Sequence, residues 1–514
     1  MFELAKRILR LLRIGLTLRR LRRSHGETER QLAREAIAAQ LADARGMAMK
    51  FGQLFAGDDE SDPFAPLVRG VEPLPLAALL PLLDRSLGCP HGEIFAQIEP
   101  YGAAASLGQV HRALLHDGTP VAIKIRYPFI VDAVNAELKI AGLLPGMGPV
   151  RRWGIDLEAY RALLRNNMAR ELDYRSEAAR QMAFAAGVAV RGLVVPRIHA
   201  GLCSESVLVS DWQEGGFIDT VADWPLRDRL LLAQTLLRTL FVSLFVHGEV
   251  HGDPHLGNTL YRRENDGTPL VALLDFGCTL PIERQRRLAL LRLIIALREG
   301  EQLQLLSALG AAGFDLVKLN GLRAELPAIC QALFTPFLVE GPFHPEQWQL
   351  SQTVRSILGE RRWWFRAAGP ADSMLLVRAF DGVITQLARL QVHLPWWPLL
   401  EQCVGAELLA EAHALTFADL PAEVAAEGEL LLHGAKSLRV RIEQGGRIDF
   451  DATMPAAAAL KLPELMPEEA IAALESMPDT DLAGTPERLK REGLKPQQLF
   501  AFDLNGRTHR IWLE

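Results

Sequence analysis

Three oxygen-bearing side chains between residues 247 and 277 have the types and spacing that phosphoryl transfer requires. In the segment HGDPHLGN (251–258), Asp253 stands five residues before Asn258. An apolar run then leads to Asp275 in LLDFG, 17 residues beyond Asn258. This chemistry needs a carboxylate near the attacking group and oxygen ligands for a magnesium ion that bridges the phosphates. The alternative is a plain turn followed by a buried strand, but the combined spacing favours Asp253 as catalytic carboxylate, with Asn258 and Asp275 as metal ligands.

A lysine upstream completes this pattern. Lys124 ends the apolar segment VAIK (121–124), and the chain has only nine lysines among its 56 basic residues. A lysine on such a strand can pair with phosphates and with a helical glutamate, whereas the alternative is an exposed strand lysine. Where ordinary kinases carry a glycine-rich loop, this chain has the run AAAS (103–106). Methyl groups restrict backbone conformations that glycine allows, so this loop is a departure from those enzymes.

Taken together, these segments resemble the UbiB/AarF family of atypical kinases, which are linked to ubiquinone biosynthesis. The segment KFGQ (50–53) is similar to the KxGQ signature, and AAAS followed by LGQVHRA is similar to the alanine-rich loop. ELDYRSEA (171–178) is similar to the ExD segment, and HGDPHLGN and LLDFG to the catalytic and metal segments. The resemblance covers about 40–405. The chain departs from the family at Leu256, where proline is usual, and in the tail beyond about 415.

The resemblance implies a role for each matching residue. Lys124 would pair with Glu177, and Glu171 and Asp173 would form the ExD pair that faces Lys50. The residues implied to bind the nucleotide, ATP or ADP with Mg²⁺, are Ala103, Ala104, Ala105, Ser106, Lys124, Asp211, Trp212 and Gln213. The last three lie in VLVSDWQEG (207–215), a hinge that would receive adenine chiefly through backbone groups.

One geometric conflict arises in the ExD segment. On an ideal helix, Glu171 and Glu177 point about 120° apart at 100° per residue, although Asp173 and Glu177 share a face. Either the helix is irregular at this point, or the cleft and the KxGQ helix contact different sides of it.

The elements that must position these residues alternate along the chain. Helices are expected over 1–57, over parts of 67–98, over about 155–189, over 225–247 and over most of 283–415. Apolar runs around 108–115 and 121–126, separated by an Asp-Gly pair, predict a hairpin. Short strands are expected at 193–200, at 206–212 and around the two metal segments. Two more hairpins are expected at 437–453 and 498–514, with a partial linker at 454–470.

The expected architecture is α+β: a bilobal protein-kinase-like fold with a helical N-terminal extension and a small C-terminal appended region. The expected boundaries are 1–98 for the extension with KxGQ, 99–215 for the N-lobe, 216–415 for the helical C-lobe and 416–514 for the tail. The 514 residues are 49% hydrophobic with a net charge of −6, which excludes a disordered chain and a basic nucleic-acid-binding one. The five cysteines are scattered, which argues against a disulfide framework or structural zinc.

The resulting interpretation is an ATP- and magnesium-dependent atypical kinase or ATPase. The resemblance implies a role in isoprenoid-quinone or other lipid metabolism, with a small or lipidic acceptor and quinone-pathway proteins as partners. Three alternatives stay open: a small-molecule kinase of the aminoglycoside phosphotransferase type, a true protein kinase, and a non-catalytic nucleotide-binding scaffold.

The location expected from the sequence is cytoplasmic, or peripheral at the inner face of a membrane. No segment reads as a transmembrane helix, because the apolar runs at 230–246 and 288–297 are interrupted by arginine and are expected to be buried. The basic run at 1–24 is equally consistent with binding to anionic lipid and with a solvated helix face. His247, His251 and His255 are expected to be structural hydrogen-bonding residues rather than metal ligands.

Overall fold

The protein is described by a computed structural model. The structure describes residues 73–105, 107–128, 130–131, 157–422, 424, 434–478 and 480–514. The expectations for the N-terminal extension before residue 73, Lys50 and the 1–24 segment among them, therefore lie outside the described residues. Ser106 lies outside them as well.

The N-lobe is built on a five-stranded antiparallel sheet. Its strands are β1 (Phe95–Ile98), β2 (Ala103–Ala104), β3 (Gly108–Leu115), β4 (Pro120–Arg126) and β6 (Val207–Asp211). The path is β1-β3-β4-β6, and β2 pairs with β3. The predicted hairpin is confirmed: Gly118 takes φ 85° between β3 and β4, and the Thr119 amide donates to Asp117. Helix was expected towards residue 98, but Phe95–Ile98 is a strand because Phe95 packs in the sheet core.

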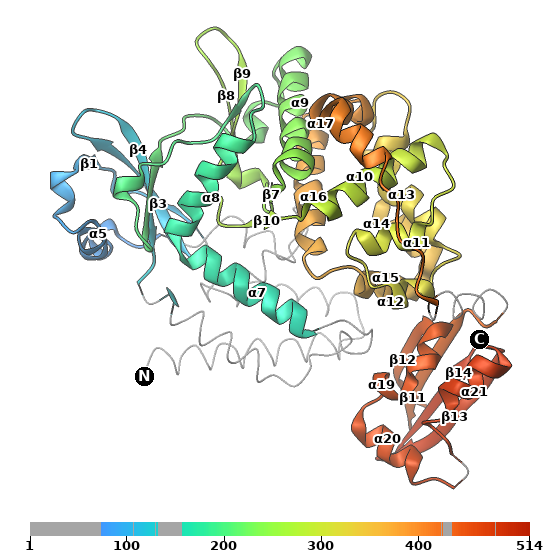
Figure 1. Ribbon diagram of the computed structural model, residues 1–514. Helices are drawn as coiled ribbons and strands as arrows, with labels where there is room; N and C mark the ends of the chain where they lie inside the picture. The colour runs from blue at the N-terminus through green and yellow to red at the C-terminus, as the bar shows by residue number, and fades with distance from the viewer. Residues whose placement is uncertain are drawn as a thin grey trace.

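Helix α5 (Leu80–Leu87) covers the apolar face of this sheet, where Leu79 and Leu83 pack with Val121, Ile123 and Ile125. Beyond the sheet, the single helix expected over about 155–189 is two helices, α7 (Leu157–Leu172) and α8 (Tyr174–Gly187). Asp173 separates them with extended backbone and N-caps α8, because its Oδ1 accepts from the Arg175 amide. The two helices run in different directions from this break (Figure 1).

Small sheets at the centre carry the catalytic segments. β5 (Leu193–Val194) is parallel to β9 (Pro269–Leu273), which pairs antiparallel with β8 (Thr259–Arg263). β7 (Glu249–His251) pairs with β10 (Thr279–Pro281), a strand that the sequence did not indicate. A single π-helical turn, Val242–His247, leads into β7, and Gly248 follows it at φ 88°. Turns of this kind concentrate near functional sites.

The C-lobe is helical, as expected. Its helices are α9 (Leu226–Phe241), α10 (Arg284–Glu299), α11 (Leu305–Ala311), α12 (Leu316–Asn320), α13 (Leu326–Leu338), α14 (Leu350–Leu358), α15 (Arg362–Ala368), α16 (Ser373–Arg389) and α17 (Trp396–His413). Their core gathers around Trp396, which contacts Phe241, Phe337 and Phe343. The span 226–247 is long and apolar enough to cross a membrane, but 61% of its most apolar stretch is buried inside the protein.

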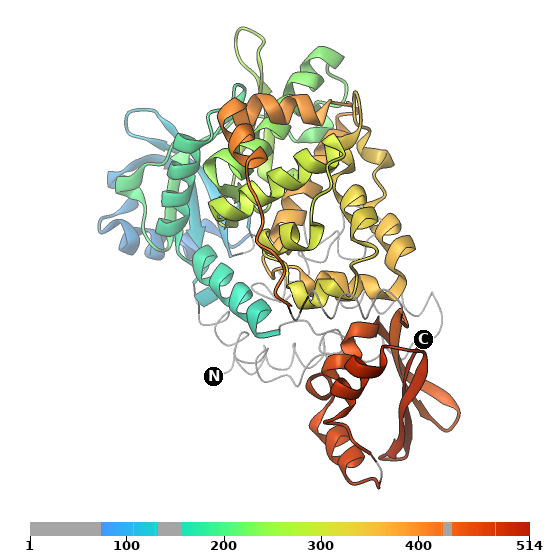
Figure 2. The same ribbon diagram turned by 45° about the vertical axis from the view of Figure 1, so that its right-hand side comes forward.

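The tail folds into a four-stranded antiparallel sheet with short helices beside it (Figure 2). The sheet order is β12-β11-β14-β13, with bounds Arg447–Pro455, Ser437–Gln444, Arg507–Leu513 and Gln497–Leu504. Both predicted hairpins are present. The described part of the tail contains the α-helices α19 (Leu462–Leu465), α20 (Glu468–Glu475) and α21 (Thr485–Glu492). The partial linker expected at 454–470 is wrong, since Ala456, Ala459 and Leu462 are buried and bind the sheet to the C-lobe.

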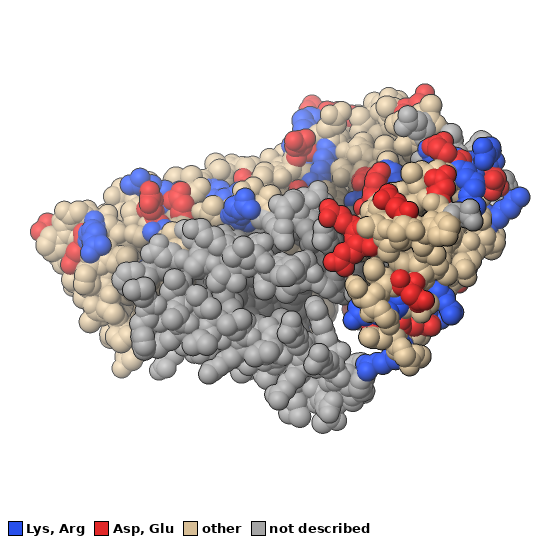
Figure 3. Space-filling model, turned by 90° about the horizontal axis from the view of Figure 1, so that it is seen from below, with Lys and Arg blue, Asp and Glu red and all other residues tan. Residues whose placement is uncertain are grey.

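Charges of both signs are interspersed on the described part of the surface seen from below (Figure 3). Acidic and basic side chains lie next to one another there rather than forming one basic field. This distribution agrees with the net charge of −6.

Candidate functional site

Three charged side chains from distant segments meet between the lobes. Lys124 on β4 places its Nζ 2.7 Å from Glu177 Oε1 on α8 and 3.1 Å from Asp275 Oδ1 after β9. The Lys124 and Glu177 side chains are 12% and 2% exposed, so this is a buried charge pair. The structure thus brings together the pair expected from the sequence and adds Asp275 to it.

The electrostatics of this triad follow from two carboxylates sharing one ammonium group. Burial disfavours the Lys124 charge, yet Asp275 and Glu177 outweigh burial and raise the pKa of Lys124 well above its usual value. Burial raises the pKa of Glu177 to about 7, with Lys124 opposing and Asp275 adding to the shift. The Glu177 Oε2 atom is buried without a hydrogen-bond partner. The site therefore holds excess negative potential that a cation would relieve.

The helix break at Asp173 resolves the geometric conflict in the ExD segment. Glu171 lies in the last turn of α7 and is 6% exposed, while Glu177 lies in the first turn of α8, so the two need not share a helix face. The Cγ of Glu171 lies 3.6 Å from the place that a Cβ on Gly277 would occupy. Glu171 therefore approaches the DFG loop, and Asp173 caps α8.

The DFG loop is held in a strained conformation by buried donors. Asp275 has φ 56°, in the left-handed region that few residues with side chains adopt. Arg180 on α8 donates to the carbonyls of Phe276 and Gly277 at 3.2 Å each. His251 Nε2 donates to the Asp275 carbonyl at 2.8 Å, while its Nδ1 accepts from the Asp253 amide. Burial lowers the pKa of His251, as this neutral form requires.

Asp253, the expected catalytic carboxylate, is 6% exposed and contacts an arginine that the sequence did not indicate. Arg378 on α16 donates to Asp253 Oδ1 from both Nε (3.0 Å) and Nη2 (2.6 Å). Paired donors of this kind hold a carboxylate in a fixed orientation and balance its charge. Helix α16 is consequently part of the site.

The same helix braces the catalytic loop at two further points. Gln386 Nε2 donates to the Pro254 carbonyl at 2.8 Å and its Oε1 accepts from the Tyr261 hydroxyl. A Cβ added to Gly382 would lie 2.8 Å from the Pro254 carbonyl oxygen, so only glycine permits this approach.

Asn258 and Asp275 fit a magnesium ion by donor type and by placement. The Leu274 amide donates to the Asn258 carbonyl at 2.8 Å, which joins the two loops directly. The side-chain Nδ2 of Asn258 donates to the Asp253 carbonyl at 3.0 Å, so the side-chain oxygen of Asn258 is the atom that could bind a metal ion. A carboxylate and an amide oxygen on adjoining loops suit a hard divalent cation.

The alanine loop begins as a strand. Ala103 and Ala104 pair with Val110 and Gln109, and the Ala105 amide donates to the Gly108 carbonyl at 2.8 Å. Gly108 is required, because a Cβ there would lie 2.4 Å from the Ile125 carbonyl oxygen. The loop is therefore bound closely onto the sheet.

Two polar residues of LGQVHRA are fully buried and were not singled out from the sequence. Gln109 exchanges two hydrogen bonds with the Leu74 backbone, at 2.8 and 2.9 Å, and also donates to His111. His111 Nδ1 in turn donates to the Glu99 carbonyl. These bonds attach the chain at Leu74 to β3.

At the expected hinge, the backbone is already partly engaged. The Asp211 amide donates to the Arg197 carbonyl and the Trp212 amide to the Pro120 carbonyl. The Asp211 side chain accepts from His199 at 2.8 Å. Any adenine contact along this segment therefore falls to its carbonyl oxygens and to Gln213.

The chain is similar to known proteins over much of its length. The signature of the ABC1 atypical kinase-like domain matches residues 67–309. The mitochondrial atypical kinase COQ8B of Rattus norvegicus is 26% identical over 374 residues, 70% of each chain. The mitochondrial atypical kinase coq-8 of Caenorhabditis elegans is 26% identical over 256 residues, 48% of this chain and 34% of the relative. The solved complex of Rv3197 with erythromycin, from Mycobacterium tuberculosis, has a TM-score of 0.50 at 26% identity and covers 76% and 98% of the two chains.

The fold and the Lys124–Glu177–Asp275 arrangement define a protein of the kinase-like class. Within that class, residues 67–309 match the ABC1 atypical kinase-like domain, and the chain is similar to relatives named as COQ8-type atypical kinases. The whole tail that begins after residue 415 lies outside the family match, which ends at residue 309.

Proposed function

We propose that this protein is an ATP- and magnesium-dependent atypical kinase or ATPase. The observation that carries the proposal is the buried Lys124 ammonium between Glu177 and Asp275, at 2.7 and 3.1 Å. In kinases a lysine in this arrangement pairs with nucleotide phosphates, and the aspartate after the strand meets the metal.

In the proposed reaction, each residue acts through charge and position. Lys124 neutralises and orients the phosphates, while Asn258 and Asp275 would hold Mg²⁺, which neutralises negative charge on the phosphates when bound. Asp253 accepts the proton of the attacking hydroxyl or water, and Arg378 fixes the orientation of that carboxylate. The adenine would lie against the carbonyls of Asp211–Gln213 and beneath Ala103–Ser106.

The acceptor is proposed to be small or lipidic rather than a peptide. Between Gly277 and α10 the chain has only Cys278–Glu283, and three of these residues form β10. This leaves the described C-lobe without the long segment on which protein kinases dock substrates. We also propose that Lys50 faces Glu171 and Asp173, so that the N-terminal extension restricts access to the site.

The biological setting is proposed from the family. Relatives in rat and nematode are named mitochondrial COQ8-type kinases, which supports a role in isoprenoid-quinone or other lipid metabolism beside a membrane. Contact with a membrane would then be peripheral, on the cytoplasmic side, and quinone-pathway proteins would be the partners. Nucleic acid is not proposed as a partner.

The proposal is tested by measuring the melting temperature of the full chain with ADP and Mg²⁺. A ligand that binds only the folded state adds about 2.7 kcal/mol at a hundredfold excess over its dissociation constant. Asp275→Asn should abolish the magnesium-dependent part of the shift, because it removes a metal-binding carboxylate.

The matched control is Asp266→Asn, in the exposed turn between β8 and β9, where Asp266 accepts from the Thr268 amide. This variant should keep the full magnesium-dependent shift. An equal magnesium-dependent shift in melting temperature for Asp275→Asn and the native protein would show that Asp275 does not bind the metal, and would contradict the proposed magnesium site.

A further inference from the structure

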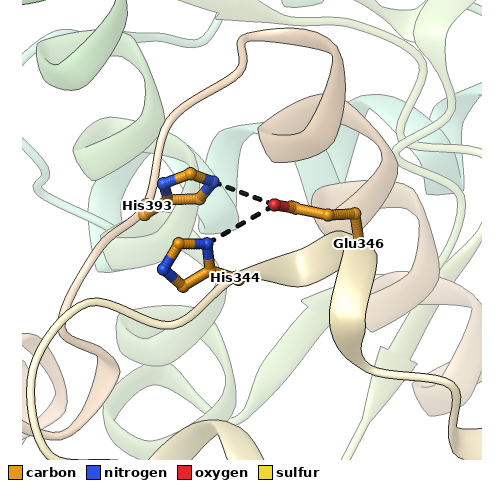
Figure 4. A group of neighbouring side chains, drawn as sticks. All are labelled: His344, Glu346 and His393. Carbon is orange, nitrogen blue, oxygen red and sulfur yellow. Dashed lines mark hydrogen bonds and ion pairs between the residues drawn. The ribbon is translucent and has the colours of Figure 1, made fainter.

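Two histidines and one glutamate converge at an edge of the C-lobe, away from the kinase site. His344 and Glu346 lie between α13 and α14, and His393 lies between α16 and α17. Their ligand atoms all lie within 4.8 Å of one another. Figure 4 shows a nitrogen of each imidazole directed towards the same Glu346 oxygen.

The backbone brings the two histidines together. Phe343 and Leu394 form an isolated antiparallel bridge, and the Phe343 amide donates to the Leu394 carbonyl at 2.9 Å. In an antiparallel pair the next residues, His344 and His393, stand opposite each other on one face. Their ring centroids lie 3.8 Å apart.

The scaffold beneath them is buried and rigid. Phe343 and Leu394 are 4% and 3% exposed, and Phe343 packs on Trp396 at 5.5 Å between ring centroids. Pro345, also buried, begins the 3₁₀ turn Pro345–Gln347 that lifts Glu346 over the histidine pair. The side chains of His344, Glu346 and His393 therefore project from buried, well-packed backbone.

The distances suit a shared metal ion. Glu346 Oε1 lies 3.1 Å from His393 Nε2 and 3.5 Å from His344 Nδ1. Tetrahedral zinc with bonds of about 2.0–2.1 Å to nitrogen and oxygen has ligand atoms about 3.3 Å apart. The rings are inclined by only 30°, so a rotation of one imidazole is needed to direct both lone pairs at one ion. Both side chains are more than one-third exposed and have room for that rotation.

We infer that His344, Glu346 and His393 form a binding site for a first-row transition-metal ion of the Zn²⁺ type. Two imidazoles and one carboxylate provide three ligands, and water completes the coordination. The mixed nitrogen and oxygen donors favour such ions over Mg²⁺, which prefers oxygen ligands alone. Metal at this site would link the loop after α16, the helix that contacts Asp253, to the loop after α13.

The test is a Co²⁺ titration of the EDTA-treated full chain, followed by the visible absorption of bound Co²⁺. Excess Mg²⁺ is present throughout, so that Asn258 and Asp275 are engaged by their own proposed ion. The native chain should bind one Co²⁺ that Zn²⁺ displaces. Replacing a residue that only hydrogen-bonds to a metal ligand typically weakens metal binding by about 10–100-fold, and the loss of a ligand itself should cost at least as much. His393→Ala and Glu346→Gln should therefore each weaken Co²⁺ binding by at least about tenfold.

The chain offers a matched control in a second cluster, Glu299, Glu301 and His413. There Glu301 is paired with Arg292 at 2.5 Å, and only one imidazole is present. His413→Ala should leave Co²⁺ affinity unchanged. Equal affinity in the native chain and in both His393→Ala and Glu346→Gln would overturn the site. So would an affinity that is lost in His413→Ala alone, because the ion would then bind the second cluster. Folding of each variant is checked by its nucleotide-induced melting shift.

Discussion

The contact between Arg378 and Asp253 gives the proposed catalytic carboxylate a fixed orientation. Asp253 is 6% exposed and lies at the end of a loop, so a cation is required to balance its charge in this position. In this chain, that cation comes from a helix 125 residues further along.

Replacing Arg378 should impair turnover more than nucleotide binding. Arg378→Gln is expected to lower ATP turnover by about tenfold or more, as part of the about 10²–10⁴-fold that a general base contributes. The dissociation constant for ADP should change little, since Arg378 contacts neither Lys124 nor Asp275. Arg378→Lys should restore part of the turnover, and Arg389→Gln, at the exposed end of α16, should behave as native. Parallel losses of turnover and ADP affinity in Arg378→Gln would indicate a structural role alone.

Lys124→Met should destabilise the protein, and more strongly at higher pH. Removing one member of a buried charge pair typically costs about 3–5 kcal/mol. The pKa of Glu177 is already raised from 4.5 to about 7 by burial, so its contribution to stability falls as the pH rises through 7. Without Lys124, the free-energy cost of burying the ionised Glu177 carboxylate grows. Urea unfolding should therefore show a larger loss at pH 8 than at pH 6.

The double variant Lys124→Met with Glu177→Met provides the control for this experiment. It leaves no buried unpaired carboxylate at α8, so it should recover much of the stability and lose the additional pH dependence. A loss in Lys124→Met that is the same at both pH values would contradict the assignment of the raised pKa to Glu177.

The residues of the site that could be predicted from the sequence are those on local motifs. Lys124, Asp253, Asn258 and Asp275 stand in short segments whose residue types and spacing indicate phosphoryl transfer, and the family resemblance implied Glu177. The structure joins Lys124 to Glu177 and Asp275, and Asn258 to Asp253. Arg180 and Arg378 could not be found in this way. Each acts through a contact with a residue about a hundred positions away, and each lies outside the motif segments.

At the scale of elements, α16 acts as a brace for the catalytic loop. Gly382 and Gln386 lie on its face towards Pro254, and Arg378 lies about one turn before Gly382. The glycine allows a close approach that any side chain would prevent. The position of the catalytic loop therefore depends on how closely this helix packs.

Gly382→Ala should displace the loop. Its Cβ would meet the Pro254 carbonyl oxygen at 2.8 Å, and overpacking of this kind typically costs about 1–3 kcal/mol. Thermal unfolding and ATP turnover should both show the effect. Gly201→Ala, where no atom lies within 4 Å of the added Cβ, should be neutral in both measurements. Native turnover in Gly382→Ala would show that the helix can shift without moving Asp253.

Elements that a turn signal or a long apolar pattern defines could be predicted from the sequence. The Asp-Gly hairpin of β3 and β4, the C-lobe helices and the two hairpins of the tail are of this kind. An irregular helix in the ExD segment was one of two alternatives expected from the sequence, but the position of the break at Asp173 was not predicted, because helical residues continue on both sides of a single N-capping residue. Strands β1 and β10 were missed because each has fewer than five residues and gains its pairing from a distant strand.

At the scale of the whole molecule, the tail and the C-lobe share one hydrophobic core. Leu319, Leu322 and Ile329 of the C-lobe belong to the same cluster of buried side chains as Leu438 and Leu460 of the tail. Figures 1 and 2 both show the tail beside α12 and α15. The tail is therefore expected to unfold together with the C-lobe.

Gly321→Val tests this coupling at the contact itself. A Cβ at this position would lie 2.8 Å from Pro455 Cβ and 3.1 Å from Ala457 Cβ. The larger side chain should separate the surfaces, so hydrogen exchange should accelerate both in α12 and in β11–β12. Gly92→Ala, with no atom near the added Cβ, is the control. Faster exchange confined to α12 would mean that the tail is stable on its own.

The short connection between Gly277 and α10 also bears on how the protein is switched on and off. Many kinases are turned on when another kinase phosphorylates a long segment after the DFG motif. Here that connection contains a single hydroxyl, Thr279, which is 2% exposed and donates to Glu249 within the protein. An upstream kinase has no acceptor to modify at this place. We therefore expect that phosphorylation of this connection does not switch the protein on or off.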